Sequence, residues 1–227
     1  MRMWTILRRG CDAWANEDDI LNRYIPPSDF YTFDPLMIDP ALLVDPILSS
    51  MAGDHEEIKM ISPKVEGIQE LVNGEPAIFD RATLLFLAAL DWDLYNDSSR
   101  PLDGGKGSKE KLGRWPTEDG NAIAYLIENI RSPTKVIEEL LAKLALGFMP
   151  DFLGEDDFDK GAFGLNLMGW ITHSEVKELR REINRGRWTV NSNESFDGGV
   201  QDGFRHLSNL LQGAAKHGVG LMMRRHS

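Results

Sequence analysis

Three aspartates in the stretch LDWDLYND, Asp91, Asp93 and Asp97, are the residues in this sequence most suited to catalysis. Carboxylates two positions apart can share a divalent cation, as in metal-assisted hydrolases and phosphotransferases. The preceding run TLLFLAAL, however, is rich in Ala and Leu, which favours a helix over a strand. If that helix continues, the side chains of Asp91 and Asp93 point about 200° apart and cannot bind one ion. A metal-assisted hydrolase or phosphotransferase using these aspartates is therefore the alternative hypothesis.

A second group of carboxylates lies in the segment PDFLGEDDFDKGAFG, residues 150–164, which the composition predicts to be an acidic loop. An EF-hand calcium loop needs a glycine at its sixth position and a glutamate at its twelfth. Counting from Glu155, Lys160 and Asn166 stand at those positions, so we expect no calcium site. We expect this loop instead to attract a basic protein partner by electrostatic steering, and its partner-binding residues are Asp156, Asp157 and Asp159.

Other sequence motifs resemble known sites but lack a required residue. The stretch HEEIK, residues 55–59, has Lys59 where a zinc-protease helix needs its second histidine. The stretch GGKGSK, residues 104–109, has Gly107 where a phosphate-binding loop needs Ser or Thr after its lysine. A Gly-x-Ser-x-Gly elbow, a dinucleotide fingerprint and a Cys-x-x-Cys pair are all absent from the sequence. We therefore expect no cofactor and no metal site, and a non-catalytic role is favoured although catalysis stays open.

The charge and composition exclude several classes of protein. The chain has 227 residues and a formal net charge of −11, which opposes binding to nucleic acid and to anionic membranes. Nucleic-acid binding through Arg180, Arg181, Arg185 and Arg187 therefore ranks last. The single cysteine, Cys11, cannot form an intramolecular disulfide. The apolar stretch Met3–Leu7 is too short for a signal peptide, and the run Ala82–Leu90 is too short to span a membrane, so we expect a cytoplasmic protein.

The elements that must position these residues are mostly helices. Their start and stop signals predict helices over 62–72, from the Asp80 cap through residue 97, over 121–131, from Ser132-Pro133 onward, and over 203–218. Asp-Pro pairs at 34, 39 and 45 suit short helix starts, with Asp as the cap. Strand candidates are RWTV at 187–190 and VGLMMRR at 219–225. The sequence predicts an α+β fold, predominantly helical, with a few short strands near the C-terminal end. We expect a single globular domain over 1–227, with a division near 100–118 as the alternative.

The stretch MGWITHSEVKELRREINRGRW, residues 168–188, has the most complete helix signals in the chain. Thr172 and Glu175 have the spacing of a capping box. Along the exposed face, Glu178 is spaced to pair with Arg181, and Glu182 with Arg185. These patterns indicate a structural helix, so we do not assign a catalytic role to its arginines or to His173.

The last sixty residues combine the helix start THSEVKEL, a turn-rich middle and a closing helix followed by HGVGLMM. This layout resembles small bacterial proteins of unknown function, some of which are similar to toxin-immunity proteins. The resemblance covers about a quarter of the chain and implies no residue roles. Together with the acidity and the failed motifs, it favours a non-catalytic interaction protein, immunity-type or regulatory, as the leading hypothesis.

Overall fold

The structure is a computed structural model that describes residues 30–90, 92–93, 98–99, 121–193 and 198–226. Several predicted features lie outside these residues: Cys11, Asp91, Asp97, the stretch GGKGSK, and the alternative domain division near 100–118. Of the aspartate cluster, the structure therefore describes only the backbone of Asp93.

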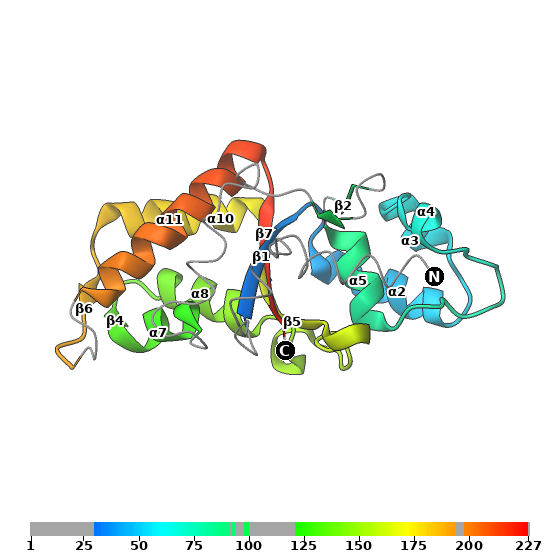
Figure 1. The fold of residues 1–227 in the computed structure, drawn as a ribbon, viewed down its shortest axis with the longest axis horizontal. Coiled ribbons are helices and arrows are strands. Elements are labelled where there is room, and N and C mark those ends of the chain that lie inside the picture. The colour runs from blue at the N-terminus through cyan, green and yellow to red at the C-terminus, as the bar shows by residue number, and fades with distance from the viewer. Residues whose placement is uncertain (1–29, 91, 94–97, 100–120, 194–197, 227) are drawn as a thin grey trace, which may run out of the picture.

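A three-stranded antiparallel sheet lies at the centre of the described chain (Figure 1). Its order is β1 (Phe30–Leu36), β7 (Gly220–His226) and β5 (Asn166–Ile171), so the last strand in sequence is the central one. The register pairs Phe30 with His226, and it contains an irregularity in β5 between Leu167 and Gly169. The first and last described segments of the chain are therefore neighbours.

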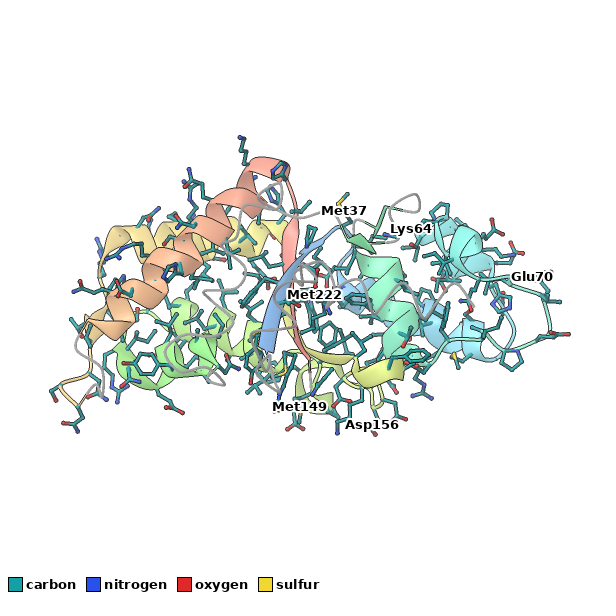
Figure 2. All side chains as sticks on the ribbon, viewed as in Figure 1. Met37, Lys64, Glu70, Met149, Asp156 and Met222 are labelled. Carbon is teal, nitrogen blue, oxygen red and sulfur yellow. The ribbon has the colours of Figure 1, made fainter. Side chains whose placement is uncertain are left out.

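Helices cover both faces of this sheet. Side chains of β7 alternate between the faces, so Leu221 and Met223 enter one core and Met222 enters the other. The helices of the first core are α7 (Ala122–Asn129), α8 (Val136–Leu146), α10 (His173–Arg185) and α11 (Gly199–His217). Those of the second core are α2 (Val44–Met51), α3 (Glu56–Ile61), α4 (Val65–Ile68) and α5 (Arg81–Ala89). Figure 1 shows the two groups on opposite sides of the sheet, and Figure 2 labels Met222 between them.

Short elements complete the described chain. They are η2 (Pro40–Leu42), the pair β2 (Trp92–Asp93) and β3 (Ser98–Ser99), the pair β4 (Ile130–Arg131) and β6 (Thr189–Val190), α9 (Pro150–Leu153) and η3 (Ala162–Gly164). Within the described part, no helix is both long enough and apolar enough to cross a membrane.

The predicted fold class, α+β and predominantly helical with short strands towards the C-terminal end, is confirmed. The local signals also hold. Asp80 caps α5 by accepting from the amide of Thr83, and Asn121 caps α7. Thr172 and Glu175 form both bonds of the predicted capping box of α10. The two strand candidates become β6 and β7.

The structure differs from several element predictions. Asp34-Pro35 does not start a helix but lies within β1, an edge strand, where a missing amide donor is tolerated. Asp45-Pro46 lies in the first turn of α2 rather than capping it. The helix expected over 62–72 is reduced to α4, which contains Gly67 and ends where Gln69 turns extended and accepts from the amide of Ile78.

The helix expected to continue from Asp80 through residue 97 ends at Ala89. Neighbouring segments bind its last carbonyls: the amides of Met37 and Ile38 both donate to Ala89, and the Ser62 hydroxyl donates to Ala88. Leu90 is extended and bridges to Leu36, and the chain continues into β2. Asp93 therefore does not lie on a helix, and the argument that helical geometry keeps its side chain from binding one ion together with Asp91 does not apply.

Candidate interaction surface

Exposed apolar and acidic side chains gather in the segment from the end of α8 to η3. We call the following residues the acidic surface: Leu146, Met149, Asp151, Phe152, Glu155, Asp156, Asp157 and Phe163. Phe152 is 52% exposed and Phe163 is 55% exposed. Among the residues whose exposure the structure describes, no other aromatic side chain is exposed. Figure 2 shows Met149 and Asp156 along the same edge of the molecule. Large apolar groups beside carboxylates are typical of a protein-binding surface rather than of a solvated loop.

The loop that carries these residues is anchored to the start of α5. The Asp80 carboxylate, which caps α5, also accepts from the amide of Ala162 at 2.9 Å. The same amide lies 3.0 Å from the hydroxyl of Thr83. Arg81 donates to the carbonyl of Asp156 at 3.2 Å. Because consecutive residues of one helix start hold two points of the loop, the loop has a defined shape.

Apolar packing and a close backbone approach reinforce this anchor. The side chain of Phe158 is fully buried in the second core, between exposed Asp157 and half-buried Asp159. A Cβ atom on Gly161 would lie 2.6 Å from the Thr83 hydroxyl, which is closer than real Cβ contacts. Glycine at 161 therefore allows the loop to approach α5 closely enough for the hydrogen bonds to form.

Two residues of the acidic surface have left-handed backbone. Asp157 has φ of 65° and Phe163 has φ of 60°, and in the described part of the chain they are the non-glycine residues with positive φ. Aspartate tolerates this region, but for phenylalanine the conformation costs about 1–2 kcal/mol. Strain of this kind persists where the surrounding structure imposes it, and it is concentrated at binding and catalytic sites. In this conformation the ring of Phe163 is exposed.

The structure places the three predicted partner-binding residues differently. Asp156 and Asp157 are exposed. The side chain of Asp159 is 26% exposed and lies 3.9 Å from the ammonium group of Lys160. The Asp159 carbonyl accepts from the amide of Leu167, so this residue also holds the loop against β5. Met149, Phe152 and Phe163 could not be predicted from the sequence, because alternation and helical periodicity give no signal for exposed apolar residues outside regular strands and long helices.

Two aspartates of the alternative site, Asp91 and Asp97, lie outside the described residues, and Asp93 is described by its backbone alone. Asp93 lies in β2, and the ammonium group of Lys64 donates to the carbonyl of Leu90 just before the cluster. Where the structure describes side chains, no three His, Cys, Asp or Glu residues are grouped so that they could hold a metal ion.

His55, from the failed zinc motif, is a buried structural residue. Its Nδ1 lies 2.7 Å from the Ser50 hydroxyl, and its Nε2 lies 3.1 and 3.0 Å from the carbonyls of Val72 and Glu75. Carbonyls only accept, so Nε2 carries a proton. Ser50 and His55 are both fully buried, which prevents this pair from acting on a substrate. The pair instead connects α2 to the segment before α5.

Glu175, at the start of α10, has a pKa that is shifted from its ordinary value. Burial raises the pKa of Glu175, but hydrogen bonds from Lys143 and Thr172 and the charge of Lys143 outweigh burial, so the pKa is lowered below its ordinary value. The Lys143 ammonium lies 2.7 Å from the carboxylate and 5.0 Å from the centre of the Trp170 ring. These contacts join α8, β5 and α10.

Two arginines of α10, Arg181 and Arg185, pair with the glutamates that the sequence predicted. Arg181 lies 3.4 Å from Glu178, and Arg185 lies 2.5 Å from Glu182.

Comparison with protein-family models, with curated proteins and with solved structures finds no match to this chain.

Proposed function

We propose that this chain is a non-catalytic interaction protein that binds a basic protein partner through the acidic surface. The observation that carries the proposal is the exposure of Phe152 and Phe163 beside Asp156 and Asp157 on an anchored loop. The segment 150–164 holds five carboxylates and one lysine, so its field attracts cations.

The two kinds of side chain have different parts in binding. Carboxylates at the rim accelerate encounter with a basic partner and make association depend on salt. Phenylalanine rings supply the affinity, because burying one fully contributes about 1.5–3 kcal/mol. Hot-spot anchors of interfaces are commonly aromatic side chains surrounded by polar residues that exclude water. Phe152 on α9 and Phe163 in η3 are the anchors in this proposal.

Because the loop is anchored, we expect it to bind a partner more tightly than a disordered acidic tail would. A surface that is already shaped loses little conformational entropy when a partner docks. The bonds from Asp80 and Arg81 therefore serve the interaction, although neither side chain contacts the partner in this account. The last sixty residues resemble small bacterial proteins of unknown function, some of which are similar to toxin-immunity proteins. This resemblance suggests the biological setting: an immunity-type or regulatory binder whose target is basic.

The proposal is tested by affinity capture from the native cytosol with three baits. The first is the wild-type chain, and the second carries Asp156→Asn, Asp157→Asn and Asp159→Asn. The matched control carries Glu56→Gln, Glu57→Gln and Glu70→Gln, which removes the same charge from exposed positions in the α3–α4 region, outside the acidic surface. We expect a basic protein that the wild type and the control retain and the loop variant loses. Equal recovery by all three baits would contradict the proposal.

A further inference from the structure

The first ten residues of the sequence, MRMWTILRRG, have the chemistry that the acidic surface would bind. They contain three arginines and no carboxylate, together with the apolar residues Met1, Met3, Trp4, Ile6 and Leu7. The following nineteen residues, 11–29, are different, because they hold five carboxylates and one arginine. A cationic and apolar segment thus stands at one end of an acidic connection.

The strand register places the origin of this connection close to the acidic loop. Tyr31 pairs with Arg225, and Arg225 pairs with Asn166 at the start of β5. Neighbouring strands lie about 4.8 Å apart, so Tyr31 and Asn166 are about 10 Å apart across the sheet. Asn166 in turn bridges to Lys160 in the loop. Figure 1 shows this end of the sheet beside α9 and η3.

We propose that residues 1–10 dock on the acidic surface and compete there with the basic partner. This inference rests on the proposed function only because both use the acidic surface. The arginines would face Asp151, Glu155, Asp156 and Asp157, and the apolar side chains would cover Phe152 and Phe163. The segment acts as an intramolecular substitute for the partner, which has to displace it.

The tether makes such competition effective even if the contact is weak. Nineteen residues reach at most about 65 Å, well beyond the distance required. A tethered segment meets its site at an effective concentration on the order of millimolar. An intrinsic Kd of about 1 mM then fills half of the sites, and about 0.1 mM fills nine-tenths of them. The apparent affinity for a competing partner falls by about twofold to tenfold over that range.

A second acidic region offers a different location for the segment. Exposed Glu56, Glu57, Glu70 and Glu75 lie in the α3–α4 region, with exposed Met60 and Ile78. No exposed aromatic residue is described there, and no strand pairing brings that region next to the start of β1. We therefore favour the acidic surface, and the experiment distinguishes the two locations.

The single cysteine, Cys11, provides a labelling site without any substitution. A nitroxide attached to Cys11 broadens the NMR signals of amides close to it, and Thr5→Cys in a Cys11→Ser chain gives a second labelling site. We expect broadening of the amides of 149–164 at low ionic strength. It should disappear at about 1 M salt, where charges are screened beyond about 3 Å. Broadening confined to α3 and α4, or broadening at neither surface, would overturn the inference.

Matched variants separate a charge-specific contact from chance proximity. Replacing Arg2, Arg8 and Arg9 by Ser should abolish the broadening, whereas replacing Lys177, Arg180 and Arg187 by Ser on the other side of the sheet should preserve it. The arginine variant should also bind a fluorescent peptide of alternating arginine and leucine about twofold to tenfold more tightly than the wild type. Broadening that survives in the arginine variant would contradict the docking mode.

The two proposals fail in different ways. If the label broadens 149–164 but the Asp156, Asp157 and Asp159 variant captures the same partner as the wild type, the proposed function fails and the intramolecular contact stands. If the label broadens neither surface but that variant loses the partner, the contact is refuted and the proposed function stands.

Discussion

The carboxylate of Asp80 accepts a hydrogen bond from the backbone amide of Ala162 at 2.9 Å, across 82 positions of sequence. The same side chain caps α5 through the amide of Thr83 at 2.8 Å. One aspartate therefore both starts a helix and fixes the loop that carries the acidic surface. The shape of the proposed interaction surface depends on this double contact.

Replacing Asp80 by Ala should lower the free energy of unfolding by about 2 kcal/mol. Loss of the helix cap contributes about 1 kcal/mol, and loss of the loop hydrogen bond contributes a similar amount. Urea unfolding measures this change. Asp45→Ala, which removes an exposed carboxylate from the first turn of α2, is the matched control and should cost about 0.5 kcal/mol. Equal losses in the two variants would show that Asp80 does not anchor the loop.

Phe163→Gly should stabilise the protein and weaken partner binding. Glycine adopts the left-handed backbone freely, which relieves about 1–2 kcal/mol, while its greater freedom in the unfolded chain returns about half of this gain. We expect a net rise of about 0.5–1 kcal/mol in the free energy of unfolding, together with loss of one aromatic anchor. Phe152→Ala removes the other exposed ring from helical backbone and should bring no gain in stability. A Phe163→Gly variant that is less stable but binds fully would reject the role given to this strained residue.

Glu175 should make stability fall in acid. Its pKa is lowered in the folded state, so across the acid range the unfolded chain binds more protons, and the free energy of unfolding rises with pH. This contribution is fully present above the ordinary value of 4.5 and is lost as the pH falls through the lower folded pKa. Urea unfolding at pH 6 and pH 3 should show a smaller pH effect in Glu175→Gln than in the wild type. Lys143→Met should also reduce it, because Lys143 is a main cause of the lowered pKa.

Local signals predicted much of the fold, since they involve residues close in sequence. Thr172 with Glu175 and Asp80 with Thr83 are pairs three residues apart, and both helix starts follow the pattern. The strand β1 was missed because its partner β7 lies 190 residues away in sequence, and Pro35 argued against a strand. The buried ion pair of Asp34 and Arg224, 2.6 Å apart, has the same distant origin.

The acidic surface was predicted in part, for a related reason. Composition identified Asp156 and Asp157 as exposed acidic residues. The exposure of Phe163 depends on a backbone conformation that the anchors from α5 impose, and no sequence period encodes it. The end of α5 at Ala89 likewise depends on donors from Met37 and Ile38, far away in the chain.

Divalent cations should leave the thermal stability of the wild-type chain unchanged. An ion that binds only the folded state raises the melting temperature by mass action, and a metal-assisted enzyme using Asp91, Asp93 and Asp97 would show this effect. A melting scan with magnesium, manganese and calcium measures it, with Asp93→Asn as the paired variant. A rise of several degrees that Asp93→Asn abolishes would favour the enzyme hypothesis over the one proposed here.

The central claim is tested most directly by the salt dependence of binding to a basic probe. Fluorescence anisotropy of a labelled peptide of alternating arginine and leucine gives its Kd at increasing salt. We expect Asp156→Asn, Asp157→Asn and Asp159→Asn together to weaken binding at low salt by about tenfold and to flatten its salt dependence, because the screened attraction is removed. Glu56→Gln, Glu57→Gln and Glu70→Gln together should change the Kd by less than about twofold, since these charges lie outside the acidic surface. An unchanged Kd and salt slope in the loop variant would contradict the account.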